Sequence, residues 1–490
     1  MADMAPATSA SAVPRATLTA EELAPVVARL RPVNAELARR YPGESGLRQP
    51  VHTVYGGAQL FTAETAVKLG EVARQALAEY APDFVALARA VGMPGADRIA
   101  EIGGLDAALA SDPERVRRER PDAWLAHAVY ARVREKLARE PVEDFRIDYE
   151  DGYGVRPDAE EDGHAAAGAR EVARGMREGT LPPFIGIRVK PLTAELHARS
   201  LRTLDIFLTT LVGEAGGLPD RFVLTLPKIA AAEQATAFAE ALERLEQRLG
   251  LGAGTLRFEA MVETPQLVVD GSGRTLLPSL VDAARGRLVA AHIGTYDYTA
   301  SLNITASYQR MRHVACDFLR SVVQLSFAGT GVWISDGSTN VMPVPIHRAG
   351  ADGAPLSDRQ VAQNRASVHG AWRMHYEDVR HSLAAGFYQG WDLHPAQLVS
   401  RYAAVYAFFL AGLEAQGARL RNFVERAAQA TLVGDVFDDA ATGQGLLNFF
   451  FRAINCGALG EEEAVAMTGV TRDELRTRSF VKILENRRQK

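Results

Sequence analysis

The chain contains few cysteines and no excess of positive charge. Its two cysteines, Cys316 and Cys456, predict no disulfide framework, and this composition fits a reducing compartment. The 55 lysines and arginines are outnumbered by 60 aspartates and glutamates, so the formal net charge is -5. This balance gives no electrostatic argument for nucleic acid or an anionic membrane surface as a partner.

Long apolar runs are scarce as well. The most apolar stretch, residues 398–412 (LVSRYAAVYAFFLAG), is interrupted by Arg401 and predicts a buried helix rather than a membrane span. Residues 1–20 are rich in alanine, serine and proline, and they lack the charged start and continuous apolar core of a secretory signal. We therefore expect a cytoplasmic protein without a membrane partner.

What the sequence does contain is a regular alternation between residues 50 and 400. An apolar run with a polar tip is followed by an amphipathic stretch, and this repeating order is typical of parallel strands joined by crossover helices. Counting VHTVYGG at 51–57 first, there are about eight units, the number that closes a (β/α)₈ TIM barrel. A doubly wound open sheet is the alternative, but no dinucleotide-type glycine fingerprint opens a helix. The other apolar runs lie at 144–151, 184–191, 222–229, 256–265, 286–302, 329–337 and 387–395.

The predicted fold class is α/β, a TIM barrel with an N-terminal helical extension and a C-terminal all-helical domain. Residues 1–49 form the N-terminal tail and helix, residues 50–400 the barrel, and residues 401–490 the helical domain. Residues 83–140 are charged, rich in alanine and helical in period, so they predict a helical insertion in the barrel. The hydrophobic fraction of 47% and the charged fraction of 23% are those of an ordinary globular protein.

Two carboxylates, Glu263 and Asp297, each lie just after an apolar run, one βα unit apart. Consecutive strands of a parallel barrel bring their C-terminal residues to the same rim, so we expect these side chains to lie close together. Two hard oxygen ligands suit Mg²⁺, with Mn²⁺ as an alternative, and leave positions open for a substrate. Taken singly, Glu263 is equally well explained as a polar strand tip and Asp297 as a helix cap.

Two cationic side chains accompany these acids. Arg188 lies within the apolar run FIGIRVKP, where its guanidinium either binds the carboxylate of an oxo-acid or forms an internal ion pair with Glu150 or Asp151. Lys228 follows the run FVLTLP. It could contact the substrate, form a structural ion pair or act as a Schiff-base lysine, and a neighbouring pair of metal ligands disfavours the last of these roles. Glu150 and Asp151 are expected to orient Arg188 and water on the metal.

The remaining candidates carry weaker signals. His394 lies at the end of the last run, in DLHPAQL, and a structural histidine explains it as well as a functional one. Asp438 and Asp439 precede a helical stretch in the C-terminal region, where helix-capping acids are common. Composition and spacing alone assign neither aspartate a catalytic role.

Six segments between residues of about 50 and 400 occur in a characteristic order: RIDYEDGYGVRPDAEEDG, IGIRVKPL, LPKI, MVETP, GTYDYTASL and GWDLHPAQL. This order resembles the malate synthase and citrate lyase β-subunit superfamily, also described as HpcH/HpaI-like aldolases. The resemblance implies a TIM barrel, with Glu263 and Asp297 as Mg²⁺ ligands and Arg188 stabilising the oxo-acid and the enolate oxygen. The residues that it implies in substrate binding are Arg188, Lys228, Gly294, Thr295 and Tyr296.

A further segment, FDDAATGQGLLNFFFRAINCGAL, resembles the malate synthase stretch in which an acid precedes Ala-Thr. The resemblance implies that Asp439 is the catalytic base, so we expect the C-terminal helices to cover the mouth of the barrel. Citrate lyase β-subunits are shorter and lack such a domain. The longer C-terminus therefore favours malate synthase.

The expected function is that of a Mg²⁺-dependent enzyme that forms or breaks a carbon–carbon bond through an enolate, acting on a 2-oxo acid. The reaction most like it is the condensation of acetyl-CoA with glyoxylate. The alternatives are a citrate lyase-like or HpcH/HpaI-type aldolase, a hydroxyacyl-CoA lyase, and a non-catalytic relative that binds a small acid. The expected partner is the 2-oxo acid, with an acyl-CoA and a second copy of the chain as further candidates.

Overall fold

The computed structural model of this chain describes residues 16–43, 46–99, 103–349, 355–425, 431–433, 436–438, 440–477 and 479–488. The chain divides into two compact units. The larger comprises residues 46–327 and 332–490, and the smaller comprises residues 1–45 and 328–331. The domain boundary expected at residue 401 falls inside a helix of the larger unit, so the C-terminal helices are not a separate body.

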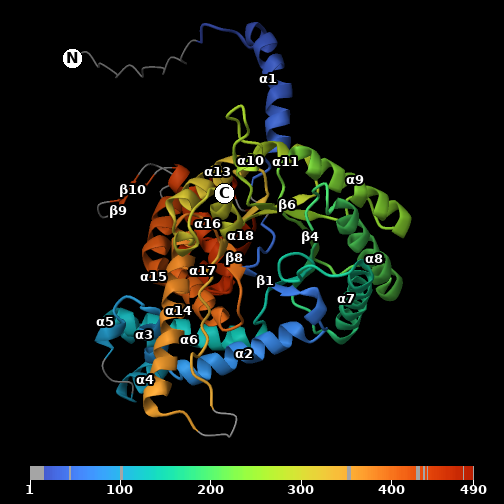
Figure 1. Cartoon of the computed structure of the whole chain (residues 1–490). Helices are drawn as coiled ribbons and strands as arrows, with labels where there is room; N and C mark the ends of the chain where they lie inside the picture. Colours follow the sequence, from blue (N-terminus) through green and yellow to red (C-terminus); the bar gives the residue numbers. More distant parts are fainter. Residues whose placement is uncertain are drawn as a thin grey trace, which may run out of the picture. The chain divides into compact units, whose positions relative to one another are not determined.

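Eight parallel strands form a closed barrel, in which each strand pairs with the next along the chain and the last pairs with the first (Figure 1). Each of the eight apolar runs overlaps one strand, so the predicted (β/α)₈ barrel is confirmed. The strands are β1 (His52–Gly57), β2 (Asp144–Asp148), β3 (Phe184–Arg188), β4 (Phe222–Leu226), β5 (Phe258–Val262), β6 (Leu288–Ile293), β7 (Trp333–Ser338) and β8 (Gln389–Asp392).

Helices connect the strands along the chain (Figure 1). Between β1 and β2 lie α2 (Thr65–Tyr80), α3 (Phe84–Val91), α4 (Gly103–Ser111), α5 (Pro113–Glu119) and α6 (Pro121–Arg139), which include the predicted insertion. The later connections contain α7 (Asp158–Glu178), α8 (His197–Ala215), α9 (Ala232–Leu249), α10 (Pro265–Val268), α11 (Leu277–Ala283), α12 (Thr295–Ser301), α13 (Val314–Phe327) and α14 (Asp358–Ala384). After β8 come α15 (Gln397–Glu425), the hairpin β9 (Thr431–Val433) and β10 (Val436–Asp438), α16 (Ala440–Asn455), α17 (Glu461–Thr468), α18 (Arg472–Thr477) and α19 (Phe480–Arg488).

The inside of the barrel holds charged side chains. Arg146 of β2 donates from Nε to Glu259 Oε1 on β5 (2.8 Å) and also pairs with Asp144. His292 of β6 lies with its Nε2 2.7 Å from Glu259 Oε2. All four residues are buried, and the guanidinium is compensated by two carboxylates, as a buried charge requires.

Helix α15 is much longer than the barrel is high. Its 29 residues span about 43 Å at 1.5 Å per residue, whereas a five-residue strand spans about 17 Å. It starts at the carboxyl end of β8, where Arg401 pairs with the last residue of that strand (2.8 Å). Tyr402 already donates to Pro141 O (2.9 Å), ahead of β2. The remaining turns extend beyond the N-terminal ends of the strands, and α16 folds back along them, with Phe449 against Phe409 (5.2 Å between ring centroids).

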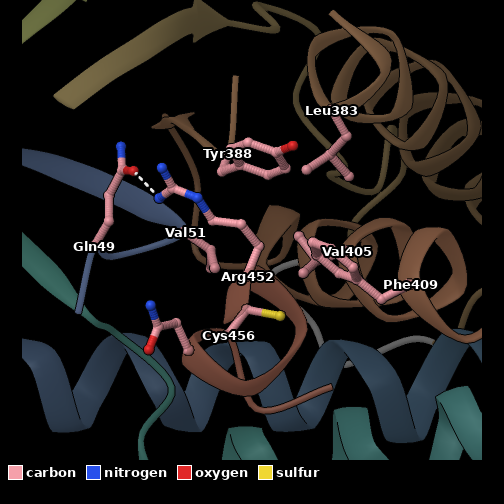
Figure 2. Close-up of a pocket in the computed structure, with 9 residues that line it drawn as sticks. Gln49, Val51, Leu383, Tyr388, Val405, Phe409, Arg452 and Cys456 are labelled. Atoms are coloured by element: carbon pink, nitrogen blue, oxygen red, sulfur yellow. Dashed lines mark hydrogen bonds between the residues drawn. The ribbon is translucent and has the colours of Figure 1, made fainter. Parts of the chain in front are cut away.

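The C-terminal helices that the structure describes pack at the N-terminal ends of the strands. Arg452 of α16 donates to Gln49 Oε1 (2.6 Å), just before β1, and lies over the ring of Tyr388 (4.7 Å to the centroid), just before β8 (Figure 2). The predicted acids follow β5 and β6 at the other end. For the described residues, the expectation that these helices cover the barrel mouth is therefore wrong, because the length of α15 carries the chain past the barrel before it turns back.

Among the described residues, α15 is the helix long and apolar enough to cross a membrane by length and composition. Of its apolar window, 72% is buried inside the protein, where α15 packs against α14 and α6. The predicted buried helix at 398–412 is thus confirmed.

The smaller unit contains α1 (Ala20–Arg40). Thr19 and Glu22 form a capping box at its start: the Thr19 hydroxyl accepts from Glu22 N–H (3.2 Å), and the Glu22 carboxylate accepts from Thr19 N–H (2.8 Å). No residue of α1 is buried. Gly43 N–H donates to Gly329 O (2.9 Å), which joins the chain after α1 to the second segment of this unit.

Candidate functional site

Glu263 and Asp297, the two predicted metal ligands, lie at the carboxyl ends of neighbouring strands. Glu263 directly follows β5 and is 1% exposed, whereas Asp297 lies in the first turn of α12, after β6, with a side chain that is 42% exposed. Lys228, just after β4, contacts both. Its N–H donates to Glu263 Oε1 (2.7 Å), and its ammonium lies 3.6 Å from Asp297 Oδ2. The structure therefore brings these three residues together.

Glu263 is a buried carboxylate in which one of the two oxygens accepts no hydrogen bond from the described residues. Its Oε2 has no hydrogen-bond partner among the described residues. A Cβ on Gly294 would lie 2.3 Å from Glu263 Oε2 and 2.5 Å from Glu263 Cβ, so glycine at this predicted substrate position lets the turn after β6 lie close against Glu263. Burial raises the pKa of Glu263 to about 8, against the opposing effect of the Lys228 ammonium. The charges of Asp297 and Glu150 contribute to the rise.

Lys228 lies in the middle of a group of acids. Its φ of 50° is uncommon for a residue that has a Cβ. Its ammonium pairs with Glu150 and lies 3.2 Å from Asp151 Oδ1. Although burial alone would lower it, the pKa of Lys228 is raised above its usual value by Glu150 and Glu263. The side chain is thus a firmly held cation rather than the neutral amine that Schiff-base chemistry needs.

Arg188, at the end of β3, is held by acids that follow or end the neighbouring strand β2. Its Nε and Nη2 donate to the two oxygens of Asp148 at 2.7 and 2.6 Å, and its Nη1 lies 3.0 Å from Glu150 Oε2. The guanidinium carbon lies 4.8 Å from the ring centre of Tyr55. The internal ion pair with Glu150 that the sequence allowed therefore exists, with Asp151 3.7 Å away, while the two hydrogen bonds to Asp148 were not predicted.

Asp148 and Tyr55 are site residues that the sequence analysis did not single out. Asp148 lies two residues beyond Arg146 on β2, so strand alternation points both side chains into the barrel, and this signal was present in the sequence. The hydroxyl of Tyr55, on β1, is buried without a hydrogen-bond partner in the described part of the chain. Its position against Arg188 follows from the pairing of β1 with β2 and of β2 with β3, for which the local sequence gives no signal.

Negative charge exceeds positive charge at this end of the barrel. Two cationic side chains, Arg188 and Lys228, are shared by more carboxylates than they can neutralise. Burial and the charge of Asp151 raise the pKa of Glu150 to about 7 in spite of both cations. The acids among the described residues are Asp148, Glu150, Asp151, Glu263 and Asp297.

The described residues contain no ready cluster of three or more His, Cys, Asp or Glu side chains that could hold a metal ion. Glu263 and Asp297 nevertheless fit a cation of the magnesium type, which binds one or two protein carboxylates and completes its coordination with water and substrate oxygens. The unpartnered Oε2 of Glu263 offers one ligand, and the exposed carboxylate of Asp297 offers a second. Glu150 and Asp151 lie beside them, within reach of both cationic side chains.

The other predicted substrate residues, Thr295 and Tyr296, are engaged in loop contacts. Thr295 Oγ1 lies 3.6 Å from Met311 Sδ, and Tyr296 OH donates to Ser338 O (2.8 Å). These contacts tie the segment after β6 to the end of β7 and to the connection between those strands. They hold in place the turn of α12 that carries Asp297.

Among the described residues, no hydrogen bond or ion pair joins His394 to these acids. Its Nδ1 accepts from Ala396 N–H (3.2 Å) in the loop after β8, and burial lowers its pKa. A structural role in that loop accounts for these contacts. Asp439, the predicted base, lies outside the described residues, and α16 packs at the opposite end of the barrel.

A small pocket lies where α16 packs on the barrel, at the N-terminal ends of the strands (Figure 2). Arg452 and Gln49 meet at its edge. Its lining contains no carboxylate, so it offers no anionic ligand to a hard metal ion. It is lined by Gln49, Val51, Leu383, Tyr388, Val405, Phe409, Arg452, Asn455 and Cys456.

The family of a domain of unknown function, DUF6986, matches residues 30–483. The chain belongs to this family. None of the curated proteins matches this DUF6986 chain.

The DUF6986 chain is similar in fold to solved structures of a citrate lyase and of malate synthase. A citrate lyase from Burkholderia xenovorans LB400 shares 18% identity with a TM-score of 0.49, over 70% of this chain and 92% of that chain. Malate synthase from Haloferax volcanii, as a lead(II) complex, shares 15% identity with a TM-score of 0.40, over 70% and 87%. The magnesium/glyoxylate complex of the same malate synthase shares 16% identity with a TM-score of 0.37, over 70% of this chain and 86% of that chain. The strand order establishes the barrel by itself.

Proposed function

We propose that this DUF6986 protein is a Mg²⁺-dependent enzyme, with Mn²⁺ as an alternative ion, that forms or breaks a carbon–carbon bond beside the carbonyl of a 2-oxo acid. One observation carries the proposal: Glu263 is a buried carboxylate with an unpartnered oxygen, beside Asp297 and within an excess of negative charge. Active sites of TIM barrels lie at this end of the strands. Clustered acids with strongly raised pKa values are a mark of functional sites.

Glu263 and Asp297 would hold the cation, which when bound polarises a carbonyl oxygen and stabilises the negative charge of an enolate. Asp148 fixes the guanidinium of Arg188 through two hydrogen bonds. Arg188 then binds the carboxylate of the 2-oxo acid through Nη1, the nitrogen that Asp148 does not use. Glu150 occupies Nη1 in the structure and, because its pKa is about 7, releases it by taking up a proton near neutral pH.

The first reaction to test is the condensation of acetyl-CoA with glyoxylate. This reaction needs a base close to the methyl group of the donor. Asp439, which the resemblance implies as that base, lies outside the described residues. A second candidate is the cleavage of a 2-oxo-4-hydroxy acid, which needs the same cation, the same Arg188 and a base for the proton of the 4-hydroxyl group, but no acyl-CoA.

Titration of Mn²⁺ into the protein, followed by electron paramagnetic resonance of the free ion, tests the metal site. We expect the unchanged chain to bind the ion and Glu263→Gln and Asp297→Asn each to lose roughly tenfold or more in affinity, because each removes an anionic ligand. Glu233→Gln, which changes an exposed acid of α9, is the matched control and should bind as before. If the double variant at 263 and 297 binds Mn²⁺ with unchanged affinity, the proposed site is wrong.

Two assays separate the candidate reactions. Release of free thiol from acetyl-CoA in the presence of glyoxylate and Mg²⁺ reports the condensation. Formation of pyruvate from a 4-hydroxy-2-oxo acid reports the cleavage. Either activity should disappear with EDTA and fall by orders of magnitude in Asp297→Asn. Metal binding without either activity would favour the small-acid-binding alternative over an enzyme of this kind.

A further inference from the structure

Helix α1 carries an apolar stripe although none of its residues is buried. The helix contains Pro25 and Pro32 in its interior, and each proline costs a helix about 3 kcal/mol. Most of the stability of a helix in a protein comes from the packing of its apolar face, so α1, with two interior prolines, requires a partner surface. The α1 stripe, whose members are between 39% and 56% exposed, consists of Leu23, Val26, Leu30, Val33 and Leu37.

The spacing of the α1 stripe alternates between three and four residues, which is the heptad spacing of paired helices. With Leu23 at position a of the heptad abcdefg, the stripe fills every a and d position from 23 to 37. Pro25 and Pro32 both fall at position c, so their rings and missing N–H groups face away from the stripe. Such a narrow seam fits another helix with the same pattern.

An antiparallel pair of α1 helices places apolar residues opposite one another. In this arrangement a positions meet d positions of the other copy. Val26 then lies against Leu37 and Leu30 against Val33, and the same two contacts recur by symmetry. The stripe forms four apolar layers in this register, and a shift of one heptad, which places Leu23 against Val33 and Val26 against Leu30, also forms four.

The charges beside the stripe select the first of these antiparallel registers. The flanking g positions are Arg29 and Glu36, and in this register each Arg29 faces Glu36 of the other copy. In a parallel pair, g positions face e positions, so Arg29 would meet Asn34 and Glu36 would meet Tyr41, without an opposite charge. The acidic first turn and the basic last turn of α1 also come together only when the helices are antiparallel.

We propose that two copies of this protein associate through antiparallel α1 helices, with the α1 stripe buried between them. The surface is an interaction site for a second copy of the chain, built from one helix. It is independent of the chemistry proposed for the barrel.

Sedimentation equilibrium of the full chain tests the association directly. We expect a mass of twice 53.0 kDa. Leu30→Glu should raise the dissociation constant by roughly a hundredfold or more, because each dimer loses two buried leucines and gains two charges in the interface. Ala28→Glu adds the same charge at position f, on the outer face, and should leave the mass unchanged. A monomer at all concentrations, or a dimer that survives Leu30→Glu, would overturn the proposal.

Charge exchange and cross-linking test the register. Glu36→Arg should weaken the dimer, and the double variant Arg29→Glu Glu36→Arg should restore it. With Cys316 and Cys456 buried, Val26→Cys together with Leu37→Cys should form an intermolecular disulfide, while neither single variant should. Disulfides in the single variants would show a parallel pair and contradict the proposal. A lower melting temperature of Leu30→Glu at unchanged monomer mass would mean that the stripe packs on its own chain, which also contradicts it.

Discussion

At the scale of single residues, the charges inside this barrel fall into two kinds. Arg146 is satisfied by Asp144 and Glu259, so its network closes on itself and accounts for its own burial. Glu263 is not satisfied in this way, because its Oε2 has no hydrogen-bond donor among the described residues and burial raises its pKa to about 8. With this pKa the carboxyl group is mostly protonated at neutral pH, and a cation bound at its unpartnered oxygen would stabilise the ionised form, so its presence at the mouth of the barrel points to a bound ligand.

A third kind of buried group is the neutral histidine. His52, on β1, accepts a hydrogen bond from Glu143 N–H at Nε2 (3.0 Å), and its Nδ1 lies 3.4 Å from Asp392 Oδ2. Burial lowers the pKa of His52 to about 4, although Asp392 and Glu143 act to raise it. The fold therefore favours the neutral ring.

The pKa of His52 predicts a loss of stability in acid. Because the folded pKa of about 4 is below the unfolded value of 6.5, the unfolded chain binds the proton first. The contribution of His52 is complete above pH 6.5 and is lost as the pH falls toward 4. Between pH 7 and pH 5 we expect the titration of His52 to lower the free energy of unfolding by about 2 kcal/mol. In His52→Gln the free energy of unfolding in urea should fall correspondingly less over this pH range. His197→Gln, at an exposed histidine, should keep the full pH dependence of the free energy of unfolding. If this pH dependence is equal in the two variants, His52 is not the cause of the loss of stability in acid.

At the scale of elements, the barrel depends on close approach between neighbouring strands. Gly186 on β3 faces Val223 on β4, and a Cβ on Gly186 would lie only 1.6 Å from the Val223 carbonyl oxygen. The atom in the way belongs to the backbone, so a side-chain rotation cannot relieve the clash. The glycine is therefore a requirement of the strand pairing.

Gly186→Ala should separate β3 from β4 and lower the free energy of unfolding by about 3 kcal/mol or more, if the variant folds at all. Gly213→Ala is the matched control, because Gly213 lies exposed in α8 with nothing within 4 Å of its added Cβ. Alanine favours a helix over glycine, so this control should raise the free energy of unfolding by about 0.5–1 kcal/mol. Equal unfolding midpoints of the two variants in urea would contradict the argument.

At the scale of the whole molecule, the length of α15 decides where the C-terminal helices lie. The helix begins at the carboxyl end of β8 and continues past the other end of the barrel, and α16 returns along its far half. The helices that the structure describes there stabilise the base of the barrel. They are remote from Glu263 and Asp297.

Arg452→Ala should therefore affect stability and leave the candidate site unchanged. Loss of its hydrogen bond to Gln49 and of its position over the Tyr388 ring should lower the free energy of unfolding by about 1–3 kcal/mol. The affinity for Mn²⁺ should stay within twofold of the unchanged chain. Arg476→Ala, at an arginine with a 66% exposed side chain on α18, should change neither quantity. A tenfold loss of Mn²⁺ affinity in Arg452→Ala would show that the C-terminal helices do act on the barrel mouth.

Much of the site could be predicted because strand ends are visible in sequence. The runs that contain β4, β5 and β6 place Lys228, Glu263 and Asp297 at the same rim, and in the structure Glu263 and Asp297 each contact Lys228. The pairing of Arg188 with Asp148 was not predicted, because Asp148 lies within the apolar run of β2 and not at its polar tip. Tyr55 was missed because its neighbours come from other strands.

The sequence by itself determined the number and order of the strands and the acids at their ends, because the hydrophobic period and the polar tips are local properties of the chain. Only the tertiary structure decided which acids pair with Arg188 and Lys228 and which oxygen of Glu263 has no hydrogen-bond donor among the described residues. It also decided at which end of the barrel the described C-terminal helices lie. Those outcomes depend on barrel closure and on the length of α15 relative to the strands, both of which arise from contacts between residues far apart in the chain.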